Sequence, residues 1–173
     1  MNMIFTIFAF VLFGALVLSN RNMMENSTTL ASENEVALVA LASAQSIIEE
    51  AKAKAFDQNT VGGVEVPDSA GLSTTLGRDG SEVATPSPDT LSATGFKSST
   101  NFNDVDDYDG YKRLEQMSNG RDDKLYDSVS VKYVRFSSPE DTSATKTYLK
   151  KMTITVTTKY IPRPYTFTYL FSY

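Results

Sequence analysis

The chain has 173 residues, of which 16 are basic and 21 acidic, and it contains no His, Cys or Trp. The missing imidazole and thiol groups exclude His-based general base catalysis, cysteine nucleophiles and His/Cys zinc sites. The formal net charge of −5 argues against a phosphate-binding surface for nucleic acid. No pattern indicates a small-molecule substrate, so we expect no enzymatic activity.

The chain begins with an uncharged apolar run over residues 3–19, MIFTIFAFVLFGALVLS. These seventeen residues would cover roughly 25 Å as a helix, slightly less than a ~30 Å hydrocarbon core. No basic segment precedes the run and no A-x-A-like cleavage site follows it, which favours an uncleaved transmembrane helix. A cleaved signal peptide, leaving a secreted domain, is the alternative.

A second helical pattern follows a polar patch and extends the N-terminal helix over residues 1–56. Ala residues alternate with Leu and Ile at spacings of four and three, which places them on one narrow helix face. The small Ala side chains permit close approach of another element. We expect this face to pack on a sheet through Ala37, Leu41, Ala44, Ile48, Ala51 and Ala55.

Residues 57–124 lose this periodicity and are rich in Gly, Ser, Thr and Pro, which predicts a loop-rich variable region. Within it, residues 102–111 read FNDVDDYDGY. The favoured interpretation is a turn in which Asp side chains accept hydrogen bonds from nearby backbone N–H groups and Gly110 takes a positive φ. Phe102, Tyr108 and Tyr111 would then pin this turn to a sheet, as a structural clasp.

The four carboxylates of this stretch allow two other interpretations. An EF-hand is excluded, because Val105 and Gln116 would occupy its first and last ligand positions. A looser calcium site remains an alternative, with Asp104, Asp106, Asp107 and Asp109 as oxygen ligands. An acid–base pair of carboxylates would need a substrate pocket and a third polar partner, which no sequence feature supplies.

Residues 125–173 alternate β-branched and aromatic residues with polar ones, a period of two that predicts antiparallel strands. We expect a three-strand meander over 125–137, 147–161 and 165–173, with its apolar face covered by the helix. The fold class is therefore α+β. If Tyr173 ends an edge strand, that edge could accept a strand from a neighbouring chain.

This plan resembles type IV pilins and the pseudopilins of type II secretion. The stretches AQSIIEEAKAKAFDQ (residues 44–58) and FNDVDDYDGY, with the pair Leu76–Gly77, are similar to segments of MSHA-type minor pilin-like proteins. The resemblance implies a long N-terminal helix that assembles with the helices of other pilin-like subunits. The contacts would come from Phe5, Phe8, Phe10, Phe13, Leu16 and Leu18.

The N-terminal motif departs from that family. Ile4 stands where the resemblance implies a Gly before the cleavage point, and Ala9 stands where it implies a Glu. In the family, this Glu pairs with the N-terminal amine of a neighbouring subunit. We therefore expect no processing by a prepilin peptidase, and a role as a minor, tip or accessory subunit.

Together these observations predict a structural subunit of a type IV pilus or type II secretion-like filament. It would be anchored in the bacterial inner membrane by residues 3–19, with its α+β head outside the cytoplasm. The alternative is a single-pass anchored extracytoplasmic domain that binds a partner and does not polymerise. No cofactor is expected, apart from calcium if the looser site forms.

Overall fold

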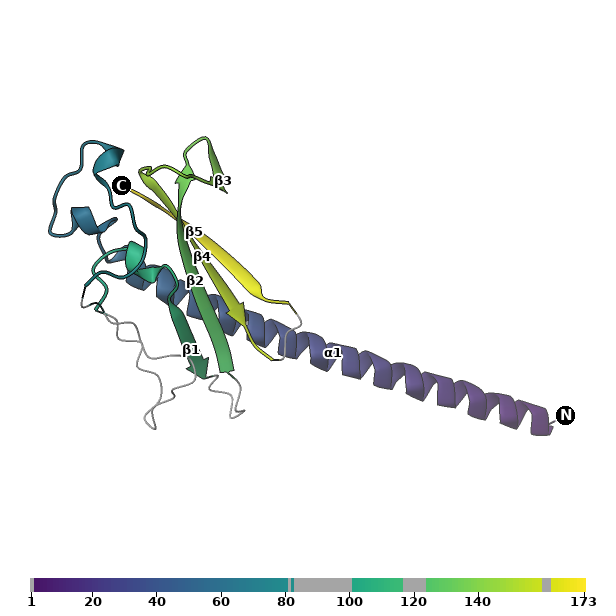
Figure 1. Cartoon of the computed structure of the whole chain (residues 1–173). Helices are drawn as coiled ribbons and strands as arrows, with labels where there is room; N and C mark the ends of the chain where they lie inside the picture. The colour runs from purple at the N-terminus through teal and green to yellow at the C-terminus, as the bar shows by residue number, and fades with distance from the viewer. Residues whose placement is uncertain (1, 81, 83–100, 117–123, 160–162) are drawn as a thin grey trace. The chain divides into compact units, whose positions relative to one another are not determined.

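The computed structural model describes residues 2–80, 82, 101–116, 124–159 and 163–173 (Figure 1). Its longest element is the helix α1 (Asn2–Lys52). Among the described residues of the region predicted to be loop-rich, three short 3-10 helices occur: η1 (Gln58–Thr60), η2 (Ser69–Gly71) and η3 (Asp106–Tyr108). The described strands are β1 (Lys112–Gln116), β2 (Lys124–Arg135), β3 (Ser138–Thr142), β4 (Leu149–Thr157) and β5 (Tyr165–Ser172).

The chain divides into two compact units. The first, Met1–Leu38, is here called the helical segment, and the second, Val39–Tyr173, is called the head. α1 contributes to both units, because it continues without a break through the Asn-, Ser- and Thr-rich patch around residues 20–35. The N-terminal helix is confirmed, and it ends at Lys52, a few residues before the predicted end.

The transmembrane prediction for residues 3–19 is wrong. Across the described part of the chain, no helix contains a stretch both long and apolar enough to cross a membrane. The physical reason lies in length, since a span needs about 20 apolar residues and the apolar run stops at Asn20–Arg21–Asn22. The predicted location, a single pass through the inner membrane with an extracytoplasmic head, is overturned with it.

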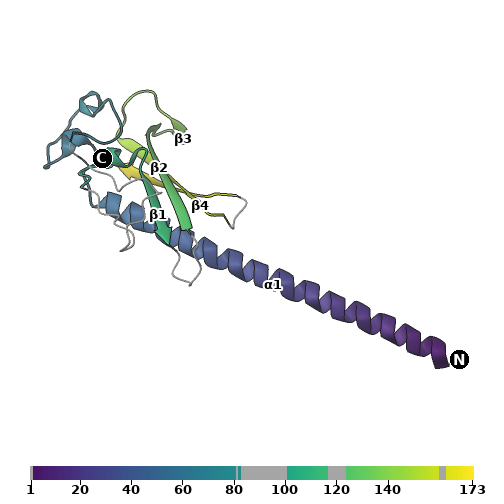
Figure 2. The same cartoon turned by 60° about the horizontal axis from the view of Figure 1, so that its bottom comes forward.

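The strands of the head form an antiparallel sheet in the order β1-β2-β4-β5, and β3 pairs with the end of β2 (Figure 2). The β2–β4 register runs from Tyr126↔Thr157 to Tyr133↔Lys150, and β4–β5 runs from Leu149↔Ser172 to Val156↔Tyr165. The predicted α+β layout, a long helix on a small antiparallel sheet, is confirmed. The meander predicted from the alternation corresponds to β2, β4 and β5, whereas β1 and β3 were not predicted.

The helix packs on the sheet through small side chains near its C-terminal end. Within the head, the fully buried residues of α1 include Ala40, Ala44, Ile47 and Ala51, and Ser43 is almost fully buried. Of the face predicted from sequence, Ala44 and Ala51 lie in this contact. The others are more accessible: Leu41 is 37% exposed, and Ala37, Ile48 and Ala55 are half-buried.

Candidate functional site

The FNDVDDYDGY segment is tied to the chain that follows α1. Ala55 and Asp104 form an isolated parallel bridge, with N–H to O distances of 3.0 Å from Ala55 to Asn103 and from Val105 to Ala55. Asp104 Oδ1 accepts hydrogen bonds from the backbone N–H groups of Asp106 (2.6 Å) and Asp107 (3.3 Å). These Asp-to-backbone bonds are the ones that the predicted turn requires.

The other end of the segment is fastened to β2. Gly110 has φ +79°, a conformation that favours glycine, and its N–H donates to Val129 O at 3.0 Å. Asp109 Oδ1 accepts from the N–H of Val131 at 2.8 Å, and its other oxygen lies 3.1 Å from Lys132 Nζ. The rings of Phe102, Tyr108 and Tyr111 meet edge to face at 4.9–5.8 Å. The predicted structural clasp is confirmed.

A buried lysine from β4 lies at the centre of the clasp. Lys150 is fully buried, and its ammonium donates to Asp57 Oδ2 and to Phe56 O, both at 2.8 Å. The same nitrogen pairs with Asp106 Oδ1 at 2.5 Å and lies 4.4 Å from the centroid of the Phe56 ring. One cation therefore joins the chain after α1, the η3 turn and the sheet.

Hydroxyl groups complete this network around Asp57. The Tyr133 hydroxyl donates to Asp57 Oδ2 at 2.8 Å, and Ser73 Oγ lies 2.9 Å from the same oxygen and 2.7 Å from Asp106 Oδ2. Asp57 also caps η1, because its side chain accepts from the N–H of Asn59 at 3.1 Å. We refer to Asp57, Ser73, Asp104, Asp106, Asp107, Tyr133 and Lys150 as the Asp–Lys cluster.

The carboxyl groups of the cluster differ in their proton affinity. Burial, together with the charges of Asp106 and Asp107, raises the pKa of Asp104 to about 7. Burial also raises the pKa of Asp106, to about 6, although Lys150 opposes this shift. Burial acts on Asp57 too, but the hydrogen bond and charge of Lys150 outweigh it and hold the pKa of Asp57 well below its usual range. The cluster thus contains more carboxyl groups than the single positive charge of Lys150 can neutralise.

A second buried polar cluster joins α1 to β1 and β2. Asp127 Oδ2 accepts a hydrogen bond from Ser43 Oγ at 2.5 Å and lies 3.4 Å from Arg113 Nε. The guanidinium of Arg113 also donates to Ser43 O at 2.8 Å and pairs with Glu115 at 2.7 Å. Burial raises the pKa of Asp127, while the Ser43 hydrogen bond and the Arg113 charge oppose the shift.

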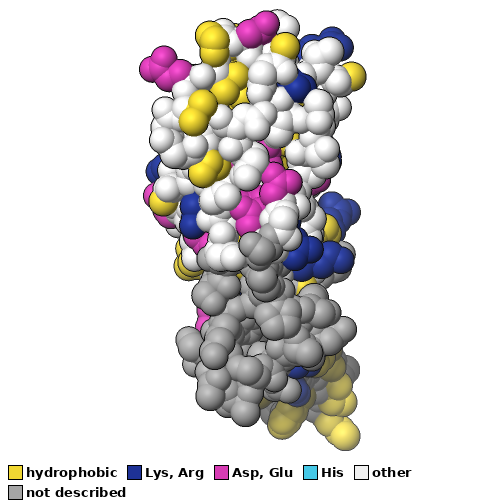
Figure 3. Space-filling model, turned by 60° about the vertical axis from the view of Figure 1, so that its left-hand side comes forward, with side chains coloured by type: hydrophobic (Ala, Val, Ile, Leu, Met, Phe, Trp, Pro, Cys, Tyr) yellow, Lys and Arg dark blue, Asp and Glu magenta, His cyan; other side chains and the backbone are white. Residues whose placement is uncertain are grey.

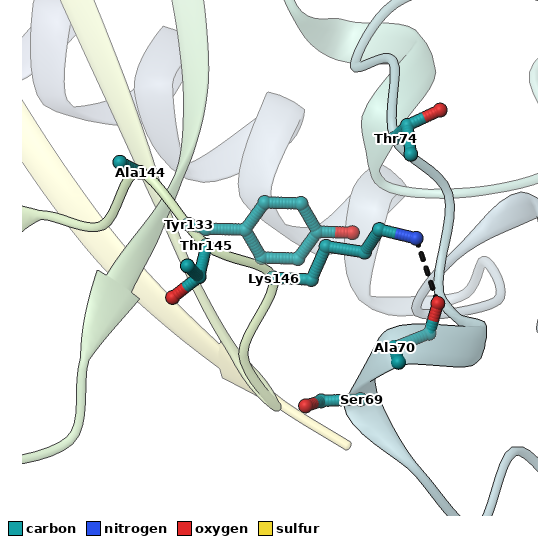
Figure 4. A pocket seen from close by; sticks show the side chains of 7 residues that line it. All are labelled: Ser69, Ala70, Thr74, Tyr133, Ala144, Thr145 and Lys146. Carbon is teal, nitrogen blue, oxygen red and sulfur yellow. Dashed lines mark hydrogen bonds between the residues drawn. The ribbon is translucent and has the colours of Figure 1, made fainter.

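A pocket of about 450 Å³ lies beside the Asp–Lys cluster. Lys146 extends past the Tyr133 ring, and its ammonium donates to the carbonyl oxygens of Ala70 at 2.7 Å and Leu72 at 2.5 Å (Figure 4). Tyr133 is the residue that the pocket shares with the cluster, and its hydroxyl is already bonded to Asp57. Lys146 therefore serves to hold η2 against the sheet.

The four predicted calcium ligands are divided between two environments. Asp104, Asp106 and Asp107 belong to the Asp–Lys cluster, whereas Asp109 bonds β2. Among the described residues, no group of three or more acidic side chains is placed so that it could hold a metal ion. Acidic, basic and hydrophobic side chains are interspersed on the part of the head coloured in Figure 3.

The predicted assembly residues lie on the helical segment and are highly accessible. Their side chains are between 62% and 74% exposed, and they point in different directions around α1: Phe5, Phe8, Phe10, Phe13, Leu16 and Leu18. They form an apolar surface of their own on residues 3–19.

Sequence reasoning missed the buried partners of the clasp, although the strand alternation carried a signal for them. Met152, Ile154 and Val156 share the buried face of β4, and one step back along that face is Lys150. In the same way, the buried face of β2 extends from Val129 back to Asp127. A charged residue in register with a buried strand face indicates a buried ion pair.

The clasp, the two buried clusters and the apolar helical surface are therefore the main features of the described residues. The chain was compared with protein-family models, with curated proteins and with solved structures. None of the three comparisons finds a match.

Proposed function

We propose that the chain is a pilin-like structural subunit that assembles with other pilin-like chains, copies of itself included, through residues 3–19 of α1. The observation that carries this proposal is the apolar surface of the helical segment. At about 100° per residue, its exposed Phe and Leu side chains point in all directions around the helix. A helix that is apolar all round is stable in water only when other apolar groups cover it.

Neighbouring helices are the covering that fits this surface best. Covering one Phe or Leu side chain stabilises an assembly by about 1.5–3 kcal/mol, so several such residues outweigh the entropy cost of association. The head has a separate role in this proposal. Its two buried polar clusters hold the sheet and the loops on the C-terminal end of α1. Each subunit that assembles through its helix would therefore carry a folded head.

The residue at position 9, Ala9, favours a particular position of the subunit in a filament. The resemblance to pilins implies a Glu here that pairs with the amine of a neighbouring subunit, and Ala9 lacks this charge. Without this ion pair, the repeated addition of such subunits along a filament would lack an electrostatic contact that positions each new subunit. We therefore propose a minor, tip or accessory position rather than the main repeating subunit.

Photo-cross-linking of the full chain tests the assembly surface. Benzoylphenylalanine is placed at Phe8, Phe10 or Phe13, and in a control at Phe136, which lies on the head and is 85% exposed. All four positions carry an exposed Phe, so general stickiness would cross-link them equally. We expect strong intermolecular cross-links from the three helix positions and few from Phe136. Equal yields at all four positions, or none on the helix, would contradict the proposal.

A further inference from the structure

The two edges of the sheet differ in how they are protected from pairing with other chains. Native edge strands usually carry charges, proline or a bulge, which discourage the addition of a further strand. β1 follows this rule, because Lys112, Arg113 and Glu115 fall within its five residues. β5 breaks it, because Tyr165–Ser172 reads YTFTYLFS, without a charge or a proline, and pairs with β4 without a break in register.

The backbone groups that β5 presents outward follow from its pairing with β4. The N–H of Tyr173 donates to Tyr148 O at 3.1 Å, so Tyr173 faces β4. Hydrogen-bonding direction alternates along an antiparallel strand, so the odd-numbered residues of β5 bond to β4. Thr166, Thr168, Leu170 and Ser172 therefore direct their backbone N–H and C=O groups away from the sheet, and all four residues are exposed.

The sequence of this edge is nearly a palindrome about Tyr169. Read outward from that residue, Thr168 corresponds to Leu170, Phe167 to Phe171, Thr166 to Ser172 and Tyr165 to Tyr173. An antiparallel partner with the same sequence would therefore place aromatic rings opposite aromatic rings. Small or uncharged residues would meet on the other face, and no charge would oppose another. The occupant that fits this edge best is β5 itself.

We propose that β5 pairs antiparallel with β5 of a second copy of the chain, in the register that places Tyr169 opposite Tyr169. In this register Thr168 pairs with Leu170 and Thr166 with Ser172, and these are the residues whose N–H and C=O groups point outward. Tyr169 then forms the central pair that is not hydrogen-bonded, with Cα atoms about 4.5 Å apart. The bonding alternation allows every register that pairs even-numbered residues with each other, and the register about Tyr169 is the one among these that pairs the whole of residues 165–173.

This contact is distinct from the proposed helix assembly. The two-fold axis of such a pair stands perpendicular to the sheet and makes the interface isologous. It reverses the direction of residues 39–52 of α1 in the second copy. The strand pair consequently cannot be the contact between parallel helices in one filament. It joins two chains, or two filaments, in opposite orientation, whether or not the helices assemble.

Site-directed disulfide formation tests the register, because the chain contains no Cys. Tyr169→Cys places two thiols opposite each other in the second-copy pair, at a Cα separation that a disulfide can bridge. In the matched control Phe167→Cys, the two thiols are four residues apart along the strands, or about 13 Å. In the detergent-solubilised full chain, we expect oxidation to produce a covalent dimer of Tyr169→Cys and little dimer of Phe167→Cys.

A second pair of variants distinguishes disulfides formed in a specific interface from disulfides formed by random collision of chains. Thr168→Lys added to Tyr169→Cys puts two like charges diagonally across the interface, and we expect at least a tenfold drop in dimer yield. Thr155→Lys is the control, since it adds the same charge one strand inward. Tyrosine near-UV circular dichroism checks that each variant is folded. Equal dimer yields from positions 167 and 169, or a yield unaffected by Thr168→Lys, would overturn the proposal.

The strand test is also independent of the helix. Phe8→Asp and Phe13→Asp together remove assembly through residues 3–19. We expect the Tyr169→Cys dimer to form equally well in that background. Loss of the dimer there would show that the strands meet only because the helices bring them together, and this result would refute an independent β5 interface while leaving the helix proposal intact.

Discussion

Lys150 is the residue on which the Asp–Lys cluster depends most. Lys150→Met would leave the buried carboxylates of Asp57 and Asp106 without their cation, and losing one partner of a buried ion pair costs about 3–5 kcal/mol. We expect the free energy of unfolding of the head to fall by that amount. Denaturant titration followed by tyrosine circular dichroism measures it, since all nine Tyr residues lie in the head.

The control for this variant is the same substitution at the next residue along the strand. Lys151→Met changes the same residue type on the opposite face of β4, where Lys151 lies 3.9 Å from an exposed Glu140. Such surface pairs contribute about 0–1 kcal/mol. Similar losses for the two variants would mean that the Asp–Lys cluster does not hold the clasp together.

The pKa shifts of the cluster predict how stability depends on pH. The pKa of Asp104 is raised to about 7 and that of Asp106 to about 6, whereas an unfolded Asp titrates near ~3.9. The folded head therefore binds more protons than the unfolded chain between about pH 4 and 7, so its stability falls as pH rises through that range. The pKa of Asp57 is lowered, so its contribution is lost only below about pH 4.

Asp104→Asn tests the cause of this dependence. The amide keeps an oxygen that can accept from the N–H groups of Asp106 and Asp107, but it carries no charge at any pH. We expect stability to rise on the order of 2 kcal/mol at pH 8 and to change little below about pH 4, where Asp104 is protonated in both the folded and the unfolded state. Thermal unfolding across this pH range measures the effect, with Asp141→Asn on β3 as an exposed control. A pH profile that stays as steep in Asp104→Asn would assign the dependence to other groups.

At the scale of elements, the contact between α1 and the sheet depends on small side chains. Ala44 is fully buried, and Ala44→Leu would force extra volume into that contact at a cost of about 1–3 kcal/mol. Ala42 is exposed on the opposite side of the helix, so we expect Ala42→Leu to change stability by less than about 0.5 kcal/mol. Chemical denaturation of the two variants compares them directly. Tolerance of Leu at position 44 would show that the helix contact is loose.

The elements differed in how far the sequence could predict them. The period-two alternation predicted β2, β4 and β5, and the run of Asp followed by Gly110 predicted the clasp, because both depend on local residue order. β1 was missed because its five residues are mostly charged, and Arg113 finds its partners Ser43 and Asp127 only in the folded head. In the Ala-rich part of α1, small apolar residues occur on several faces of the helix, so the sequence alone did not determine which face is buried. The contact with the sheet determines it.

The prediction of site residues from sequence was limited in the same way, because it depended on local residue order. The acidic residues of the clasp could be named from sequence, but Lys150 lies 93 positions from Asp57 and no local pattern connects the two. The prediction of a membrane span failed for a different reason. Residues 3–19 are apolar, but the run stops at Asn20–Arg21–Asn22, and the helix continues through polar residues.

At the scale of the whole molecule, the central claim is that residues 3–19 assemble the chain. Sedimentation of the purified full chain after detergent removal tests it most directly, with the Phe8→Asp/Phe13→Asp double variant beside Phe136→Asp. We predict large assemblies for the wild type and for Phe136→Asp, and species no larger than a dimer for the double variant. Wild-type chain that sediments as a monomer, or a double variant that assembles like the wild type, would contradict the account.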